Sequence, residues 1–196
     1  MARWPDMRMN MRLTLVRHPA PAIAPGLCYG RSDVPVDPAA LDAVLAALAT
    51  SLPRATGTAV YSSPLQRCTA LSAPLAAQLG MPAPLLDARL AEIDFGAWEL
   101  RRWDDIPIAE IDAWAADLAG YVPGGGESLL QAARRVADFL DALKRQQVAD
   151  AIVVCHAGTM RLLAALNRTD SIETAALDAA ATPHRIDYGG ILTLQF

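Results

Sequence analysis

The sequence predicts an α/β fold, a three-layer α/β/α sandwich built around a mainly parallel central sheet. Short, strongly apolar runs alternate along the chain with longer segments of helical character. No internal repeat or long linker interrupts this alternation. The β-α-β-α order therefore favours a parallel sheet with helices on both faces.

Two apolar runs in the first half of the chain are expected to be strands, residues 13–18 (LTLVRH) and 58–63 (TAVYSS). After the first run, Asp37 is expected to cap a helix that begins at Pro38. After the second run, Ser63 and Pro64 repeat this cap-then-proline start and predict a helix through Leu79. Each strand of this half is therefore followed by a helix.

The second half continues the alternation, beginning with a short strand or extended segment over 84–98. Three further helices are expected, over residues 106–120, 128–147 and 159–167. Ser128 and Gln131 have the spacing of a capping box at the start of the longest one. Another buried strand is expected over 151–156, and the alternating tail, 184–196, predicts a hairpin or a pair of edge strands.

Composition limits the classes of protein that need to be considered. The chain has 196 residues, 53% of them apolar, and a net charge of −4, which is typical of one ordinary globular domain. Neither a basic nucleic-acid surface nor a membrane-spanning stretch is indicated. Cys28, Cys68 and Cys155 cannot all pair and lack zinc or redox spacing, which favours a reducing cytoplasm. Residues 1–10 are expected to be a disordered extension of a single domain, 11–196.

Three of the predicted strands carry polar side chains where they end. The first ends at Arg17 and His18, the second at Ser63 with Arg67 one turn into the next helix, and the third at His156. Ligands of open α/β sheets bind outside the carboxyl ends of the strands. Any one of these residues could be purely structural, but their joint position at one edge predicts a binding or catalytic site.

The stretch IVVCHAGTMR, residues 152–161, supports two nucleophiles. Cys155 and Arg161 form a C-x5-R pattern, in which a cysteine thiolate would attack phosphorus and the arginine would grip the phosphate. Against this, Val154 precedes the cysteine where tyrosine phosphatases have a histidine, and His18 is left without a role. Cys155 is better interpreted as a small buried hydrophobic residue.

The alternative, a histidine nucleophile, is supported by a family resemblance. The motifs LVRHPAP, YSSPLQR, LAEIDFGAWE, PGGGES and VVCHAGTMR occur in the order and spacing of the histidine phosphatase (phosphoglycerate mutase-like) superfamily. The resemblance runs from about Arg12 to His156 and on toward the C-terminus. The segment RHPAPAIAPGLCYGRSDVPV, with WDDIP further on, is most similar to the bacterial α-ribazole phosphatases of cobalamin biosynthesis.

This resemblance implies a role for each matching residue. His18 would attack phosphorus and carry the phosphohistidine, while Arg17 and Arg67 would hold the phosphate oxygens. His156 would stabilise charge on the transferring group. Glu92 would protonate the leaving oxygen and then accept a proton from the hydrolytic water. The implied mechanism needs no metal and no cofactor.

The sequence also departs from the family pattern. Pro-Ala-Pro at 19–21 replaces the residues, including a threonine hydroxyl, that usually follow the nucleophile. Leu100 stands where a glycine is common, which is expected to alter the turn beyond Glu99. The choice of Glu92 as the acid, rather than Asp94 or Glu99, depends on the resemblance.

Candidates for substrate contacts beyond the phosphate are weaker: Tyr29, Arg31, Ser32, Trp98 and Trp103. The aromatic members could stack on a planar base, but core or rim positions explain them as well. Arg31 and Ser32 could contact substrate or simply form a turn. The glycines at 124–126 could hinge a lid or form an ordinary loop, and His184 has no assigned role.

The sequence thus predicts a metal-independent phosphomonoesterase that acts on α-ribazole 5′-phosphate or a similar nucleotide-like ester. Alternatives within the family are a broad-specificity phosphatase of small metabolites and a phosphoglycerate mutase. A cysteine phosphatase and a non-catalytic phosphate-binding protein are the remaining alternatives. The expected partner is a small phosphorylated metabolite, with no nucleic acid or membrane, and the oligomeric state is not predicted.

Overall fold

The computed structural model describes residues 11–52, 58–183 and 185–196. The expected disorder of residues 1–10 and the unassigned His184 lie outside this part of the chain. Within it, one sheet has the strand order β3-β2-β4-β1-β5. Its strands are β1 (Arg12–Arg17), β2 (Ala59–Ser62), β3 (Leu85–Leu86), β4 (Asp150–Cys155) and β5 (Ile191–Gln195). All neighbouring pairs are parallel except β1 and β5.

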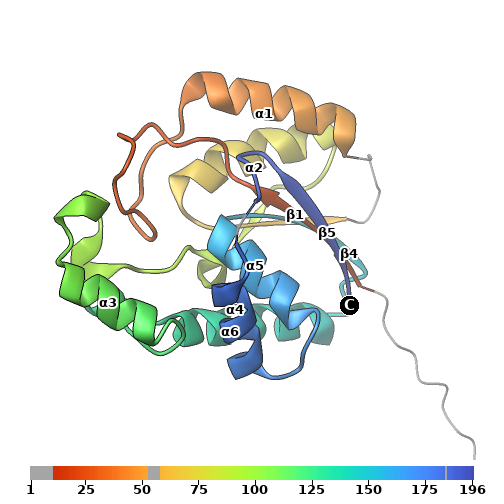
Figure 1. The fold of residues 1–196 in the computed structure, drawn as a ribbon. Helices are drawn as coiled ribbons and strands as arrows, with labels where there is room; N and C mark the ends of the chain where they lie inside the picture. Colours follow the sequence, from red (N-terminus) through yellow and green to blue (C-terminus); the bar gives the residue numbers. More distant parts are fainter. Residues whose placement is uncertain (1–10, 53–57, 184) are drawn as a thin grey trace, which may run out of the picture.

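Helices cover both faces of this sheet (Figure 1). On one face lie α1 (Pro38–Ser51) and α2 (Gln66–Leu79). On the other lie α4 (Leu129–Arg145), α5 (Ala157–Leu166) and α6 (Ile172–Ala181). The short helix α3 (Ile108–Ala116) lies to the side of these layers (Figure 1). The predicted three-layer α/β/α sandwich is therefore confirmed. No described helix combines the length and apolar character that crossing a membrane requires.

Alternation along the strands builds the two cores. On β4, Ile152 and Val154 pack against α1 and α2, whereas Val153 and Cys155 face α4, α5 and α6. Successive side chains of a strand point to opposite faces, so a strand covered on both sides must be apolar throughout. This explains why the central strands appear in the sequence as continuous apolar runs.

Two predicted helix starts are confirmed by their caps. Asp37 accepts a hydrogen bond from the Ala40 amide at 2.8 Å. Ser128 and Gln131 form the reciprocal bonds of a capping box at the start of α4. Each such cap satisfies amides that would otherwise lack a partner in the first turn, and contributes about 1 kcal/mol to stability.

A third helix start was predicted wrongly. α2 begins at Gln66 rather than at Pro64, and its N-cap residue, Leu65, has no side-chain capping bond. The Ser63 hydroxyl does accept a hydrogen bond from the Leu65 amide, at 3.3 Å, but its shorter contact is with His156. A residue interpreted as a cap is therefore part of the strand-end cluster.

The C-terminal third also differs from the prediction. The tail forms the single edge strand β5, not a hairpin or a pair of strands, and β5 pairs with β1. Helix α6 was not predicted at all, because its alanine-rich sequence has little hydrophobic pattern beyond Ala175, Ala176 and Ala179, which are buried. Leu100 has φ of 63°, so the turn after Glu99 keeps the left-handed backbone that glycine adopts more easily.

The sheet register brings the strand ends together. Arg17 of β1 is opposite Cys155 of β4, and Ser62 of β2 is opposite Val154. The next residues along these strands are His18, His156 and Ser63, so all three leave the same edge of the sheet. The juxtaposition expected from the sequence follows directly from parallel pairing.

Candidate active site

Two buried histidines form the centre of the strand-end cluster. The ring centroids of His18 and His156 are 5.0 Å apart, with the ring planes tilted by 60°. His18 is 2% exposed and His156 is fully buried. The amide of His18 donates to the carbonyl of Cys155 at 3.1 Å, extending the ladder between β1 and β4 by one bond. The backbone pairing therefore holds the two imidazoles side by side.

The surroundings of His18 fix its tautomer and its charge. Nδ1 lies 2.7 Å from the carbonyl oxygen of Pro19. Because a carbonyl can only accept, Nδ1 carries the proton and Nε2 keeps its lone pair. Burial lowers the pKa of His18 to about 3, and the nearby Arg67 and Arg17 charges act in the same direction against the bond to Pro19. His18 is thus a neutral imidazole whose Nε2 forms no hydrogen bond with the residues that the structure describes.

His156 is also held neutral. Burial above all, and then the adjacent His18, Arg67, Arg135 and Arg17, lower the pKa of His156 well below its ordinary value. Its Nε2 lies 2.8 Å from the Ser63 hydroxyl and 3.5 Å from the Cys68 sulfur. Ser63 therefore orients the second imidazole, a role that was not predicted.

Arg67 is held by carbonyl oxygens of an extended segment. It projects from the first turn of α2 and is fully buried. Its Nη1 donates to the carbonyl of Ser32 at 2.7 Å, and its Nη2 donates to the carbonyl of Gly30. Its Nε has no hydrogen-bond partner within the described residues. These contacts orient the guanidinium group without neutralising its charge.

Arg17 is held in the same way by the segment before β5. Its Nη1 donates to the carbonyl of Ile186 at 2.5 Å, and its guanidinium carbon lies 4.0 Å from the ring centroid of Tyr188. The hydroxyl of Tyr188 is 2.7 Å from that of Tyr29, whose ring lies near Arg67. A pair of tyrosines thus connects the surroundings of the two arginines.

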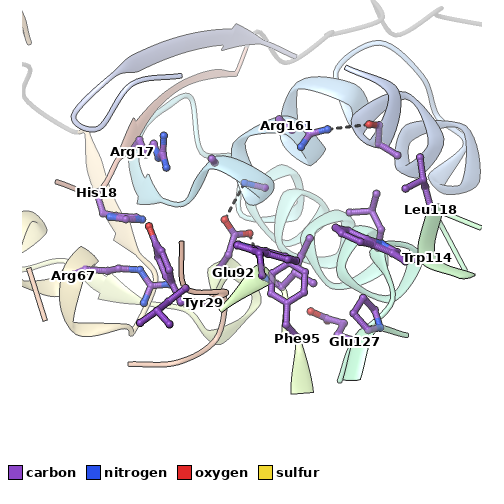
Figure 2. Close-up of a pocket in the computed structure, with 18 of the residues that line it drawn as sticks. Arg17, His18, Tyr29, Arg67, Glu92, Phe95, Trp114, Leu118, Glu127 and Arg161 are labelled. Atoms are coloured by element: carbon purple, nitrogen blue, oxygen red, sulfur yellow. Dashed lines mark hydrogen bonds between the residues drawn. The ribbon is translucent and has the colours of Figure 1, made fainter. Parts of the chain in front are cut away.

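Glu92 lines the same cavity and lies between these groups and Trp114 (Figure 2). Its Oε2 accepts a hydrogen bond from the Gly158 amide, at 3.0 Å, in the first turn of α5. A Cβ at position 158 would lie 2.3 Å from Oε1, so any other residue there would displace the Glu92 carboxylate from this position. Arg135, paired with Glu127, donates to the Ala91 carbonyl at 2.7 Å and fixes the backbone beside Glu92.

The cavity has a volume of about 510 Å³ and two chemically different ends. One end carries the polar groups described above. Toward the other end lie Phe95, Trp114 and Leu118, together with the charged side chains of Glu127 and Arg161, and Leu27, Ile93 and Trp103 also line the cavity. Trp103 and Trp114 stack with nearly parallel rings, at 9° and 6.1 Å. Figure 2 shows Arg17, His18 and Arg67 at one side of this cavity and Trp114 and Leu118 at the other.

Arg17, His18, Arg67 and Glu92 converge on one cavity, with His156 buried beside His18. Of the weaker candidates, Tyr29 and Trp103 line the cavity. The other three, Arg31, Ser32 and Trp98, do not line it.

Trp98 is fully buried in a separate cluster, where its Nε1 donates to Glu110 at 2.6 Å, so a ligand cannot stack on it. Arg31 and Ser32 do not line the cavity; their amides donate to Glu99. The chain turns tightly at both places, so the side chains of Trp98, Arg31 and Ser32 do not face the cavity.

The alternative nucleophile, Cys155, is in no position to react. It is fully buried in the core, and burial raises the pKa of its thiol well above the ordinary value. Arg161 does not close a loop around an anion site, because its Nη2 donates to the carbonyls of Ala179 and Ala180 in α6. Cys155 is a small buried residue at the end of β4.

Sequence comparison identifies the class of protein to which this fold and cavity belong. The model of the histidine phosphatase superfamily (branch 1) matches residues 13–181. The chain therefore belongs to that superfamily and is a phosphatase.

Solved structures agree with this assignment. A candidate α-ribazole-5′-P phosphatase of Escherichia coli K-12 is 26% identical, with a TM-score of 0.79 over 94% of this chain and 90% of its own. A protein of Thermus thermophilus is 28% identical, with a TM-score of 0.68 over 93% and 92%. The α-ribazole phosphatase of Shigella flexneri, at 24% identity, shares the fold with a TM-score of 0.76 over 93% and 89%. The comparison with curated proteins gave no match.

The buried neutral imidazoles make stability depend on pH. Since the pKa of His18 is about 3 in the folded state and about 6.5 when unfolded, acid protonates the unfolded chain first. This contribution to stability is complete above about pH 6.5 and falls as the pH is lowered toward 3. Urea unfolding should show a loss of up to about 1.4 kcal/mol per pH unit that is absent from His18→Gln. Parallel curves for the two proteins below pH 6 would contradict a neutral buried His18.

Proposed function

We propose that this phosphatase hydrolyses phosphomonoesters through a phosphohistidine on His18, without a metal, and that residues 11–196 act as one catalytic domain. The observation that carries this proposal is the fixed tautomer of His18. Its Nδ1–H is tied to the Pro19 carbonyl at 2.7 Å, which leaves the Nε2 lone pair available at the edge of the cavity. A neutral imidazole with an oriented free nitrogen is the form that attacks phosphorus.

The proposed reaction has two steps. In the first, the Nε2–P bond forms as the ester P–O bond breaks, and Glu92 gives its proton to the leaving oxygen. In the second, water attacks phosphorus, Glu92 accepts the water proton, and inorganic phosphate leaves with His18 restored. The Gly158 amide donates to Oε2 of Glu92 at 3.0 Å and the Ile93 amide donates to Oε1 at 3.2 Å, so both oxygens of the proposed acid are oriented by backbone amides.

The charges of the site suit a phosphate dianion. Arg17 and Arg67 are oriented by neutral carbonyl oxygens, so their positive charge remains available to the equatorial oxygens of the phosphoryl group. His156 is proposed to act in its neutral, donating form, since its surroundings lower its pKa. Fixed donors of this kind need no reorganisation when charge develops in the transition state.

For the substrate, we propose α-ribazole 5′-phosphate, and hence a role in cobalamin biosynthesis in the cytoplasm. The phosphate end of the cavity continues into the wall formed by Phe95, Trp103 and Trp114, where a planar dimethylbenzimidazole could stack. The likeness to the E. coli protein supports the same substrate class. Buried free thiols at all three cysteines fit a reducing compartment.

The substrate is tested by comparing kcat/KM for α-ribazole 5′-phosphate and ribose 5-phosphate, which lacks the base. Stacking of the base should favour the former, and Trp114→Ala should reduce that preference about tenfold or more. Ile108→Ala, an exposed change on the same helix, serves as the control. Equal kcat/KM for many esters would favour a broad-specificity phosphatase, and isomerisation of 3-phosphoglycerate would favour a mutase.

The role of Glu92 is tested by the leaving group. Glu92→Gln should lower kcat for ribose 5-phosphate by about 10²–10⁴-fold, because an alkoxide needs the proton. The loss on p-nitrophenyl phosphate should be far smaller, since nitrophenolate leaves without one. Equal losses on both esters would remove Glu92 from the role of acid.

The nucleophile is tested by a pair of variants assayed in EDTA. His18→Ala should abolish turnover, whereas Cys155→Ser should keep most of it, because the buried thiol is not ionised. An acid-labile, base-stable phosphoenzyme should be trapped from the wild-type protein and from Cys155→Ser. An active His18→Ala beside a folded but inactive Cys155→Ser would transfer the chemistry to the cysteine, and loss of all activity in EDTA would contradict the metal-free mechanism.

A further inference from the structure

Glu99 lies outside the cavity, yet its carboxylate accepts hydrogen bonds from several backbone amides and from one hydroxyl group. Its carboxylate accepts from the amides of three consecutive residues, Gly30 at 3.0 Å, Arg31 at 2.8 Å and Ser32 at 3.0 Å. It also accepts from the Ser32 hydroxyl and from the Phe95 amide, the latter at 3.0 Å. Successive amides that converge on one anion form a nest, which fixes the peptide planes of the segment.

The opposite edge of this segment holds Arg67. The carbonyl of Ser32 accepts from Nη1 at 2.7 Å, and the carbonyl of Gly30 accepts from Nη2. In a trans peptide the N–H and C=O point in opposite directions. The Arg31 amide, turned toward Glu99, therefore turns the Gly30 carbonyl of the same peptide toward the arginine, and the Ser32 carbonyl follows at the end of the anchored segment.

Close packing keeps the segment in this place. A Cβ on Gly30 would lie 1.9 Å from the carbonyl oxygen of Ile93 and 2.7 Å from the Phe95 ring. The segment thus lies directly on the chain between Glu92 and Glu99. Any movement of it would change the surroundings of Arg67.

Glu99 remains a carboxylate in this position. Burial acts to raise its pKa, but the bonds from Ser32 and from the amides of Phe95, Gly30 and Arg31 outweigh burial, and the net pKa lies below its ordinary value. The anion does not line the cavity, in contrast to Glu92. Its charge is therefore directed at the backbone and not at a ligand.

We propose that Glu99 is a positioning residue for phosphate binding, which fixes segment 30–32 so that its carbonyls aim Arg67 into the cavity. This proposal rests on the proposed function only in treating Arg67 as a phosphate ligand. Glutamine at position 99 would offer one acceptor oxygen and would turn an NH₂ group toward the amides. The segment would then lose its anchor, and Arg67 its fixed orientation.

The test is a double-mutant cycle with inorganic phosphate as the probe. Titration calorimetry of wild type, Glu99→Gln, Arg67→Met and the double variant gives phosphate dissociation constants without any turnover. Glu99→Gln should weaken phosphate binding about ten- to a hundredfold, since hydrogen bonds to a charged group are lost. In the Arg67→Met background the same change should cost less than about twofold, because its effect passes through Arg67.

Further variants separate positioning from loss of structure. Glu110→Gln alters a neighbouring carboxylate that accepts from Trp98, and should leave phosphate binding unchanged. Ser32→Ala deletes one donor to Glu99 and should weaken binding about threefold, again only with Arg67 present, so the proposal stays testable if Glu99→Gln does not fold. With p-nitrophenyl phosphate, Glu99→Gln should raise KM far more than it lowers kcat.

Two results would overturn the role of Glu99: an unchanged dissociation constant in a folded Glu99→Gln or Ser32→Ala, or equal losses with and without Arg67. A wild-type protein that binds phosphate in this pattern but hydrolyses no ester would instead contradict the proposed function. The two failures are therefore distinguishable.

Discussion

The parallel pairing of β1 with β4 is the constraint on which the site depends. It sets Arg17 opposite Cys155, so the next residue of each strand is a histidine and the two rings come within 5.0 Å. The pairing is itself fixed by apolar side chains that alternate between two cores. A slip of one residue would turn every one of these side chains to the wrong face, so the cores that stabilise the sheet also specify the positions of the imidazoles.

The two arginines of the site are oriented by backbone groups and not by carboxylates in direct contact. Within the described residues, neither Arg17 nor Arg67 forms an ion pair; both are oriented by main-chain carbonyl oxygens. A carboxylate in direct contact would cancel part of the charge that a phosphate dianion needs. Glu99 lies outside the cavity and accepts from the amides of the segment that holds Arg67, and Glu127 pairs with Arg135 beside Glu92.

The sequence predicts what depends on local pattern, and misses what depends on contacts between distant loops. The mainly parallel sheet, two of the three helix starts and the cluster around His18 follow from periodicity, capping chemistry and motifs at strand ends. The bond between Tyr29 and Tyr188 joins residues with no periodic or motif signal. For Trp98 and Trp103 the sequence left a cavity position and a core position open, because the chain turns in 3₁₀ geometry at both; Trp103 lines the cavity and Trp98 lies in the core.

In the sheet, β1 lies between the two strands that come last along the chain, β4 and β5. During synthesis, the strand that carries Arg17 leaves the ribosome roughly 140 residues before β4 does, a delay on the order of ten seconds. Both edges of this apolar strand stay unpaired for that interval, when contacts with other nascent chains are most damaging. His18 is therefore translated early, but the strand pairing that brings it beside His156 forms only when β4 has been made.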